Sequence, residues 1–571
     1  MENNIETIRH SLSHVMAAAI MEMFPDAKLG IGPAIENGFY YDFDLSKNLV
    51  PEDLPKIEKK MREIIAKDLE FEKSEMDIKS ADLFKDQPYK LELIKDLEAD
   101  GEKAISLFKT GEFIDLCKGP HITNTSELKN VGWKLDKTAG AYWKGSEKNK
   151  MLQRIYAIAF ESKEKLEEYL KMREEAEKRD HRKIAQDLDL FSFHEEGPNF
   201  VFWHDKGWAV FQKMLEYWRS IHRREGYTEV NTPIMMTKGV WEQSGHLKNY
   251  GEKIYLAKSP DSEEFNYAVK PMNCIGGILI YKTKMHSYKD LPLRVGEIGL
   301  VHRYESSGEV HGLMRLRQFN QDDAHIYCRP DQVKDEILKV FKLAFEVYEK
   351  FGLEIDHIEL STRPEKSIGS DEVWNNAESI MKEILAENKI DHQINEGDGA
   401  FYGPKFDFHL KDAIGRTWQC GTIQLDFAQP ENFDLTYVDE KGEKVRPVML
   451  HRVIFGAIER FLGVYIENVA GAFPLWLAPV QTKILPISDK HLDYAKKIMA
   501  ELVENNVRVE LDDRTESVGK KIREAEMQKI PYMLIVGDKE IEADKVAVRI
   551  YGEGDKGQMD VKEVAKDICK S

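Results

Sequence analysis

A highly charged stretch from Ser162 to about Asp187 divides the chain, and it constrains the fold more than any other feature of the sequence. Its few apolar side chains recur at helical spacing, namely Leu166, Tyr169, Leu170 and Met172. This pattern predicts a long exposed helix, because one narrow apolar stripe cannot form a core of its own. Such a helix is typical of a linker, so we expect separately folded bodies on either side of it.

Composition places the chain among ordinary globular proteins. Its 571 residues correspond to about four domains at roughly 150 residues each. A hydrophobic content of 42% and a charged content of 32% exclude collagenous, disordered and membrane-embedded chains. The formal charge of −19 is not typical of a nucleic-acid-binding protein, but it does not exclude a local basic face.

Cysteine content and the apolar segments point to a cytoplasmic protein. Five scattered cysteines are too few for a secreted disulfide framework: Cys117, Cys274, Cys328, Cys420 and Cys569. No apolar run approaches the roughly 20 residues that span a bilayer, and the first residues lack the basic segment of a signal peptide. We therefore expect no membrane partner.

The periodicity of each part predicts a multidomain α+β chain. Before the linker, the pattern predicts helices over 5–24, 53–70 and 91–109 and a strand over 39–43. After it, strand-like segments alternate with loops up to about Pro474. The last part alternates strands (482–486, 507–511, 532–536, 546–550) with helices (491–505, 517–528), which predicts a small, largely parallel α/β sheet.

The first candidate site combines two histidines with a cysteine and a third histidine. His10 and His14 lie four residues apart on a predicted helix and so share one face. Cys117 and His121 add a thiol and an imidazole on a loop. These residue types suit a zinc site or a hydrolytic pocket. The alternative is a pair of helix-face histidines and an unrelated buried cysteine.

The second candidate site is rich in arginine. Arg303, Glu305, Arg315 and Phe319 lie among short apolar segments. Guanidinium groups bind phosphate bidentately, a carboxylate can accept from an exocyclic amine, and an aromatic ring can stack on a base. The alternative is a surface hairpin with a salt-bridged rim. Since the chain has no Walker loop, nucleotide binding here would depend on arginines.

The third candidate set is Cys274, His325 and His451, which are far apart in sequence. A catalytic zinc keeps three protein ligands and one open position. Spacing alone does not reveal such a site, and each residue taken singly suits packing better than metal binding. Cys328, three residues after His325, is a local competitor as a ligand.

Taken together, these strings resemble the class II aminoacyl-tRNA synthetases, and closely the bacterial-type threonyl branch. The resemblance covers essentially the whole chain. It rests on Arg303-Tyr-Glu305, Gly456-Ala-Ile-Glu-Arg460, Phe319-Asn-Gln-Asp-Asp-Ala-His325, Ala400-Phe-Tyr-Gly-Pro-Lys405, the run from Trp418 to Phe427, His10-Ser-Leu-Ser-His14 and Cys117-Lys-Gly-Pro-His121.

The resemblance implies a class II catalytic domain, an antiparallel sheet flanked by helices. An α+β editing domain would precede it and an α/β anticodon-binding domain would follow. The implied boundaries are 1–160 for editing, 161–186 for the linker helix, 187–474 for catalysis and 475–571 for anticodon binding.

The resemblance also assigns site residues. Arg303, Arg460 and His246 would be catalytic, with His246 assisting the transfer step. ATP would contact Arg303, Glu305, Arg315, Phe319, Gln419 and Arg460. The threonine pocket would contain Gln321, Asp323, Tyr402 and Gln424, with one Zn²⁺ on Cys274, His325 and His451. Editing would use His10, His14, Cys117, His121, Asp115, Lys90 and Tyr41, and anticodon contacts would come from Glu540 and Arg549.

The implied function is ATP-dependent attachment of L-threonine to tRNA(Thr) through a threonyl-adenylate, with Mg²⁺ accompanying ATP. A zinc that reads the threonine hydroxyl would reject valine. Serine keeps the hydroxyl and differs only by a methyl group, a difference of about 1–3 kcal/mol. Hydrolytic editing of Ser-tRNA(Thr) in the first body would then supply the missing accuracy. Pro233 falls where the family places a proline at its homodimer interface.

Two departures from the family pattern stand out. The chain starts almost at His10, without the ubiquitin-like domain that the family often carries before the editing body. After Cys274 the usual Pro-Gly-His is replaced by Ile275-Gly276-Gly277. Two other functions remain as alternatives: a synthetase-like RNA-binding regulator without catalysis, and a zinc hydrolase that uses the first body alone.

Overall fold

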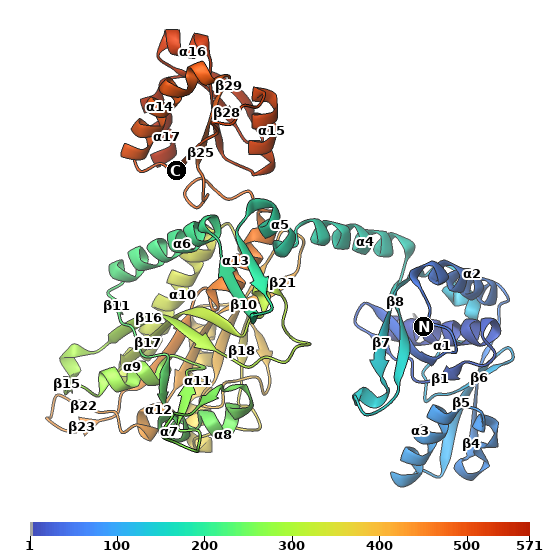
Figure 1. Ribbon diagram of the computed structural model, residues 1–571. Coiled ribbons are helices and arrows are strands. Elements are labelled where there is room, and N and C mark those ends of the chain that lie inside the picture. Colours follow the sequence, from blue (N-terminus) through green and yellow to red (C-terminus); the bar gives the residue numbers. More distant parts are fainter. Residues whose placement is uncertain (1–3, 571) are drawn as a thin grey trace. The chain divides into compact units, whose positions relative to one another are not determined.

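The computed structural model describes residues 4–570, so residues 1–3 and 571, which the implied boundaries include, lie outside the described residues. The chain divides into two compact units, one up to residue 175 and one from residue 176 (Figure 1). Both units mix helices and strands, which confirms the multidomain α+β prediction. The exact domain boundaries remain predictions.

The N-terminal unit is built around a buried helix, α1 (Ile5–Met23), whose residues 11–20 are all buried. Asn4 caps this helix by accepting a hydrogen bond from the backbone of Glu6. The helix packs against a sheet with strand order β1-β3-β8-β7 and against helix α2. The bounds are β1 (Lys28–Leu29), β2 (Ala34–Ile35, paired with β3), β3 (Gly38–Asp44), α2 (Leu54–Ile65), β7 (Gly132–Tyr142) and β8 (Met151–Phe160).

A second, three-stranded sheet completes this unit and carries the loop with Cys117. It has the order β4 (Phe71–Asp77), β5 (Ala104–Thr110), β6 (Phe113–Leu116), and α3 (Pro88–Ala99) packs beside it. The predicted helix over 91–109 is therefore wrong beyond Ala99. Gly101 breaks it with a φ of +91°, and the following segment alternates between exposed and buried residues, as a strand does.

The charged stretch forms two helices instead of one. Helix α4 (Lys163–Lys178) has no buried residue, as its charge pattern predicts. Helix α5 (His181–Leu188) starts anew after Asp180, whose side chain accepts a hydrogen bond from the backbone of Arg182. This cap explains the interruption, because a side-chain acceptor at that position favours a helix start.

The C-terminal unit centres on an eight-stranded sheet of order β11-β16-β17-β24-β21-β20-β18-β19 (Figure 1). The six central strands pair antiparallel, and only the outermost pairs, β11 with β16 and β18 with β19, are parallel. The bounds are β11 (Thr228–Glu229), β16 (Leu293–His302), β17 (Gln318–Cys328), β18 (Glu354–Ser361), β19 (Gln393–Asn395), β20 (Lys405–Lys411), β21 (Thr417–Asp426) and β24 (Val448–Val453).

One face of this sheet forms the main core, and its other face carries polar residues. On β18 and β20, Ile358, Leu360, Phe406 and Phe408 belong to a hydrophobic cluster with helices α10 and α11, while the alternate residues are polar. The helices of this part are α6 (Asp205–Arg224), α7 (Lys238–Gln243), α8 (His246–Tyr250), α9 (Cys274–Tyr281), α10 (Val333–Lys350), α11 (Asp371–Glu387), α12 (Ala428–Asn432) and α13 (Ile458–Asn468).

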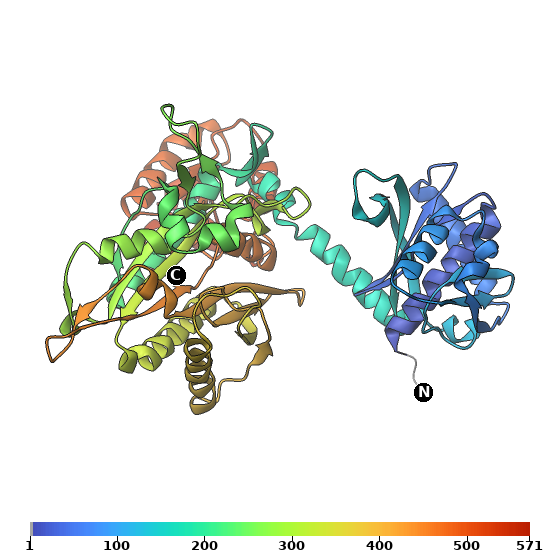
Figure 2. The same cartoon turned by 90° about the horizontal axis from the view of Figure 1, so that it is seen from below.

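The C-terminal unit, which Figure 2 shows from below, also contains three small sets of short strands that are separate from the large sheet. They form the pair β9 (Phe191–His194) with β10 (Gly197–Trp203), the set β12 (Met235–Thr237), β14 (Tyr267–Val269), β13 (Leu256–Ala257), and the set β15 (His286–Ser287), β22 (Tyr437–Val438), β23 (Lys444–Val445).

The last part of the chain forms a five-stranded sheet of order β26-β25-β27-β28-β29. Only β26, β25 and β27 are parallel, so the sheet is mixed and the prediction of a largely parallel sheet holds for that half alone. The bounds are β25 (Thr482–Pro486), α14 (Leu492–Glu504), β26 (Val509–Leu511), α15 (Val518–Met527), β27 (Tyr532–Val536), α16 (Asp538–Ala543), β28 (Val546–Ile550), β29 (Gly554–Met559) and α17 (Val561–Lys570).

Among residues 4–570, none of the helices combines the length and the apolar content that a membrane crossing requires.

Candidate active site

A cavity of about 790 Å³ lies against the polar face of the eight-stranded sheet. It brings together most residues that the sequence assigned to catalysis, although they come from widely separated segments. The predicted site residues that line it are Arg303, Glu305, Arg315, Phe319, Gln419, Arg460, Gln321, Asp323, Tyr402, Gln424, Cys274 and His451. His246 and His325 are not in its lining.

One part of the cavity presents positive charge beside an aromatic ring. The Arg303 guanidinium carbon lies 5.1 Å from the centroid of the Phe319 ring, and Nε of Arg303 donates to the backbone oxygen of Pro271 over 3.1 Å. Strand pairing explains this proximity, because Phe319 on β17 stands opposite Val301, two residues before Arg303. Arg460, on α13, has a buried Nε without a hydrogen-bond partner among the described residues. An anionic ligand would satisfy that donor.

Glu305 forms the acidic part of the same region. Its carboxylate accepts from Lys253 over 2.7 Å and from Arg315 over 3.1 Å. Sequence reasoning missed Lys253, and no motif signalled it. The two cations fix the carboxylate in position, so it can serve as an acceptor for a ligand amine.

The predicted threonine pocket is a small hydrogen-bonded region deeper in the cavity. Tyr402 donates to Oε1 of Gln424 over 2.5 Å, and Asn273 donates to the Asp323 carboxylate over 3.2 Å. Burial raises the pKa of Asp323 to about 6. A cationic ammonium group placed beside this carboxylate would offset the burial and favour its ionised form.

Two of the three predicted zinc ligands, Cys274 and His451, line the cavity, and His325 lies beside His451. His325 on β17 and His451 on β24 stand directly opposite each other, with ring centroids 5.0 Å apart and planes nearly perpendicular. Cys274 begins α9 and lines the same cavity. The ligand atoms of these three residues are not among the described groups that gather within 4.8 Å of one another.

The donor set nevertheless fits a zinc ion with one open position. Nε2 of His325 is buried without a hydrogen-bond partner among the described residues. Nε2 of His451 lies 2.8 Å from Oδ2 of Asp426, the outer-shell carboxylate that metal-binding histidines commonly have. Sequence reasoning missed Asp426, although it lies in the Trp418–Phe427 run that supported the family resemblance.

His246 lies behind this set and is fully buried. Its Nδ1 contacts the Ser244 hydroxyl over 2.7 Å, and its Nε2 lies 3.7 Å from Sγ of Cys274. Burial lowers its pKa to about 3, so the ring is neutral at neutral pH.

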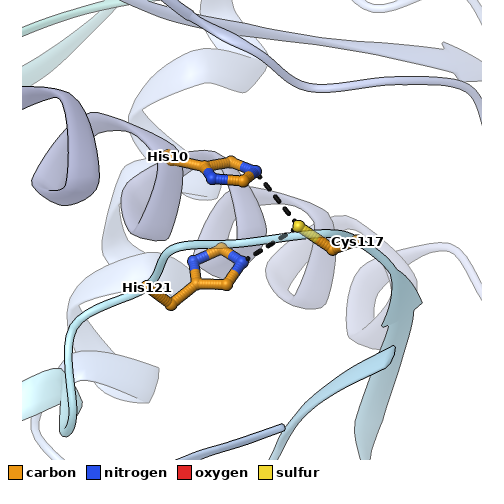
Figure 3. Close-up of side chains that lie close together, drawn as sticks. All are labelled: His10, Cys117 and His121. Carbon is orange, nitrogen blue, oxygen red and sulfur yellow. Dashed lines mark hydrogen bonds between the residues drawn. The ribbon is translucent and has the colours of Figure 1, made fainter. Parts of the chain in front are cut away.

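The N-terminal unit contains a compact cluster of His10, Cys117 and His121 (Figure 3). Sγ of Cys117 lies 3.2 Å from Nε2 of His10 and 3.2 Å from Nε2 of His121. The remaining ring nitrogens are also engaged: Nδ1 of His10 contacts the Pro120 oxygen over 3.2 Å, and Nδ1 of His121 contacts the Ser11 hydroxyl over 3.1 Å.

His14 lies near this cluster but does not complete it. Its ring centroid is 5.1 Å from that of His121, and its Nε2 is buried without a hydrogen-bond partner among the described residues. Burial lowers the pKa of His14 to about 3 and that of His121 to about 2, and it raises the pKa of Cys117 to about 11. At neutral pH these groups are therefore uncharged.

Three further predicted editing residues form one buried network. Lys90 contacts Asp115 over 2.6 Å and donates to the Tyr41 hydroxyl over 3.0 Å, and that hydroxyl donates to Asp115 over 2.5 Å. Asp115 precedes Cys117 by two residues, so this network borders the thiol cluster.

The two predicted anticodon residues are engaged in local structure. Glu540, on α16, accepts from the Gly537 backbone over 3.0 Å and from Gln558 over 2.8 Å. Arg549, on β28, pairs with Glu526 over 2.9 Å. The structure therefore does not join Glu540 and Arg549 in one contact among the described residues.

Family models match three segments of the chain. Residues 255–469 match the class II core domain of tRNA synthetases (G, H, P, S and T), residues 481–570 match an anticodon binding domain, and residues 105–156 match the second additional domain of threonyl and alanyl tRNA synthetases.

Curated relatives match nearly the whole chain. A threonine--tRNA ligase of Clostridium tetani is 56% identical over 569 residues, covering 99% of this chain and 88% of the relative. That of Carboxydothermus hydrogenoformans is 55% identical over 566 residues, with the same two coverages.

Two solved structures also resemble it. The RNA binding domain of threonyl-tRNA synthetase from Cryptosporidium parvum has a TM-score of 0.66 and 37% identity, covering 68% of this chain and 98% of that one. A putative threonyl-tRNA synthetase from Aeropyrum pernix has a TM-score of 0.58 and 29% identity, covering 69% and 94%.

Proposed function

Because the chain belongs to the threonine--tRNA ligases, which are class II aminoacyl-tRNA synthetases, we propose that the cavity on the eight-stranded sheet is where it activates threonine. The enzyme joins L-threonine to tRNA at the expense of ATP and contains the domain associated with editing in this family. The observation that carries the site proposal is the convergence of Arg303, Phe319 and Arg460 with the threonine-pocket residues in one cavity.

ATP would lie with its adenine against Phe319 and its phosphates against the two arginines. Arg303 would hold the α-phosphate, and the unpartnered Arg460 would contact the γ-phosphate side. Glu305 would accept from the adenine amine, and Arg315, already paired with Glu305, would flank the nucleotide. Mg²⁺ accompanies ATP in this class of enzyme and neutralises phosphate charge.

The threonine carboxylate then attacks the α-phosphate. It is ionised at neutral pH, so this step requires no general base. Negative charge develops on the phosphate oxygens, and fixed guanidinium groups stabilise that charge. The chain's residues thus contribute mainly by positioning and electrostatics.

A zinc ion held by Cys274, His325 and His451 would set the amino-acid specificity. The ion would supply a Lewis-acidic position able to bind the amino and hydroxyl groups of threonine together. Asp323 would hold the substrate ammonium, while Tyr402 and Gln424 would close the pocket around the side chain. Valine cannot bind through a hydroxyl, so we expect strong rejection of valine and only weak rejection of serine.

For the transfer step, His246 would act on the ribose hydroxyl of tRNA. The ring is neutral at neutral pH, but burial lowers its pKa to about 3 and makes it a weak base. Its role as a proton acceptor therefore requires that the α8 region move and relieve the burial when tRNA binds.

The cluster of His10, Cys117 and His121 would hydrolyse Ser-tRNA(Thr). Its neutral thiol and imidazoles can bind the seryl group and orient a water molecule by hydrogen bonds. The buried network of Lys90, Asp115 and Tyr41 would fix the position of the adjacent loop. The potential ligand atoms of His10, Cys117 and His121 lie close together, so metal-assisted hydrolysis is a second possible mechanism for this cluster.

We further propose a cytoplasmic homodimer that reads the tRNA(Thr) anticodon through Glu540 and Arg549. Pro233 is exposed and is followed by the exposed apolar residues Ile234 and Met235, which suits an interface between subunits.

Amino-acid-dependent ATP–pyrophosphate exchange tests the site directly. We expect strong exchange with threonine, weaker exchange with serine and negligible exchange with valine. Absence of exchange with all three, in folded and zinc-loaded protein, would favour a non-catalytic RNA-binding role. Zinc analysis of Cys274→Ser and Cys117→Ser separates the hydrolase alternative, which requires the second substitution to lose metal.

A further inference from the structure

Three potential metal ligands converge on the large sheet outside the lining of the cavity of about 790 Å³. His357 and Glu359 lie on β18, and His409 lies on the adjacent antiparallel strand β20, directly opposite His357. One ligand atom from each residue lies within 4.8 Å of the others. We propose that these residues form a second site for a divalent cation of the zinc type, separate from Cys274, His325 and His451.

The strand geometry places all three side chains on one face. Residues 357 and 359 are two apart on a strand and therefore point the same way, and directly paired residues on adjacent strands share a face. Between them, Ile358 points into the core on the opposite face. The two imidazole rings are stacked, with centroids 4.2 Å apart and an interplanar angle of 12°.

The distances match those between neighbouring ligands on one ion. Nε2 of His357 lies 3.2 Å from Oε1 of Glu359, and Nε2 of His409 lies 3.4 Å from Oε2 of the same carboxylate. Ligand atoms bound tetrahedrally to zinc at about 2.0–2.1 Å are separated from one another by about 3.3 Å. Both separations are longer than a charge-assisted hydrogen bond of about 2.7–2.9 Å.

Hydrogen bonds from neighbouring residues orient two members of the cluster, His357 and Glu359. Asp356 lies 2.7 Å from Nδ1 of His357. A carboxylate can only accept, so Nδ1 carries the proton and Nε2, unless also protonated, presents its lone pair to Glu359. Asn395 donates to Oε2 of Glu359 over 2.9 Å. Metal-binding histidines commonly donate a hydrogen bond to a carboxylate, and metal-binding carboxylates commonly accept one from a nearby donor.

A proton on His357 is the competing explanation. Burial alone would lower the pKa of His357, but hydrogen bonds to Asp356 and Glu359 outweigh it and raise that pKa. One proton satisfies the contact between His357 and Glu359 only. Nε2 of His409 stays buried, without a hydrogen-bond partner among the described residues. A cation between the three groups would satisfy both histidines and the carboxylate.

Neighbouring charges leave room for the cation. Lys405, on the same strand as His409, pairs with Asp398 over 2.9 Å and with Asp407 over 2.8 Å. The side chains of His357, Glu359 and His409 are each 18–19% exposed, so the cluster lies close to the surface although Nε2 of His409 is itself buried. Two imidazoles and one carboxylate suit Zn²⁺, Co²⁺ or Ni²⁺ better than Mg²⁺ or Ca²⁺.

Cobalt provides a probe that distinguishes this site from one that contains cysteine. The full-length chain is stripped of metal and titrated with Co²⁺, and bound metal is counted by native mass spectrometry and followed by absorption. Thiolate-bound Co²⁺ gives charge-transfer absorption in the near ultraviolet, whereas a site of histidine and carboxylate gives only weak visible bands. We expect a double variant, His357→Gln with His409→Gln, to bind one Co²⁺ fewer with the thiolate band unchanged.

Two further variants keep the test decisive. Glu359→Gln preserves the side-chain size and an oxygen for Asn395, so it reports on the site even if the double variant fails to fold, and it should also lose one Co²⁺. His392→Gln is the matched control, because His392 lies next to β19 and its Nδ1 contacts the backbone oxygen of Ile390. It should bind metal as the parent does. Unchanged stoichiometry in the double and Glu359 variants would overturn the proposal in favour of the protonated ion pair. ATP–pyrophosphate exchange is read separately, so failure of this proposal leaves the activation site untouched.

Discussion

The chain combines a cysteine with histidines at two places, and the surroundings of the two sets differ. In the N-terminal unit, Cys117 contacts His10 and His121 directly, and the outer ring nitrogens face a backbone carbonyl and a hydroxyl. In the C-terminal unit, His325 and His451 stand apart from Cys274, and a carboxylate, Asp426, supports one ring.

This difference shows that environment, more than residue type, decides the chemistry. In the first set, neutral side chains contact one another and their neighbours through hydrogen bonds. Such an arrangement is suited to orienting a water molecule. The second leaves a buried nitrogen of His325 unpartnered and supplies negative charge nearby, which suits a metal ion. Substitutions that affect one reaction and spare the other test this contrast.

Cys274→Ser should have the largest effect. Loss of a zinc ligand removes the proposed hydroxyl-reading position, so threonine activation should fall by more than about 100-fold, since loss of an outer-shell partner alone costs about 10–100-fold. ATP–pyrophosphate exchange measures this. Hydrolysis of preformed Ser-tRNA(Thr) should be unchanged, and a parallel loss of hydrolysis would remove the contrast.

Cys117→Ala should show the reverse pattern. Hydrolysis of Ser-tRNA(Thr) should fall by about 100-fold, which is the usual contribution of a positioned proton-transfer or orienting group. Threonine activation should remain intact, and Ser-tRNA(Thr) should accumulate in charging assays with serine. If no Ser-tRNA(Thr) accumulates, the cluster does not edit.

Asp426→Asn tests the difference between the two sets directly. In the C-terminal set, the Asp426 carboxylate contacts the proposed ligand His451, whereas the ring nitrogens of the N-terminal set face a carbonyl and a hydroxyl. The amide would donate toward Nε2 of His451 and favour the wrong tautomer. Zinc affinity should fall by about 10–100-fold, as measured by competition with a chelator. Asp434→Asn, at an aspartate whose side chain is exposed and pairs with Arg446, serves as the matched control.

Tyr41→Phe should weaken the N-terminal unit. The substitution removes the hydroxyl that donates to Asp115 and accepts from Lys90, leaving buried charges less well satisfied. The free energy of unfolding of this unit should fall by about 1–3 kcal/mol. Hydrogen exchange in β3 and β8 measures it, with Tyr142→Phe, at an exposed tyrosine, as the control.

His14 should make the N-terminal unit sensitive to acid. Its folded-state pKa is about 3 because of burial, whereas the unfolded chain takes up a proton near pH 6.5. The unfolded state therefore binds more protons between these values, so stability falls as pH falls below about 6.5, by up to about 1.4 kcal/mol per pH unit.

His14→Gln should reduce the slope of this dependence in hydrogen exchange of α1 by up to the contribution of one proton. The part due to His10 and His121, whose pKa values burial also lowers, should remain. His194→Gln, at an exposed histidine of the other unit, should leave it unchanged. An identical slope in parent and His14 variant would contradict the assignment.

Much of the fold was predictable where the pattern is local. The buried helix at 5–23, the exposed α4 and the first strands of the last sheet follow from periodicity alone. The end of α3 was missed because one glycine with positive φ, Gly101, outweighs helix-forming neighbours. The break at Asp180 was missed because capping competes with continuing charge periodicity.

The same distinction between local pattern and tertiary packing applies to the candidate sites. An i,i+4 spacing correctly placed His10 and His14 on one helix, but only tertiary packing decides that His10 alone contacts Cys117. His325 and His451 become neighbours through strand register, which no spacing rule could supply. Family resemblance, not local pattern, named them together, and it gave no indication of His357 and His409.

The exposed helix α4 has a consequence for the history of such chains. It has no buried side chain and adds surface contacts to the N-terminal unit, such as Tyr169 with Phe160 and Arg173 with Asp136, and the division between the two compact units falls within it. Substitutions, insertions or a cut there leave both cores intact. A gene could therefore exchange its proofreading module for another, or lose it, without any change to the residues that hold the rest of the protein together.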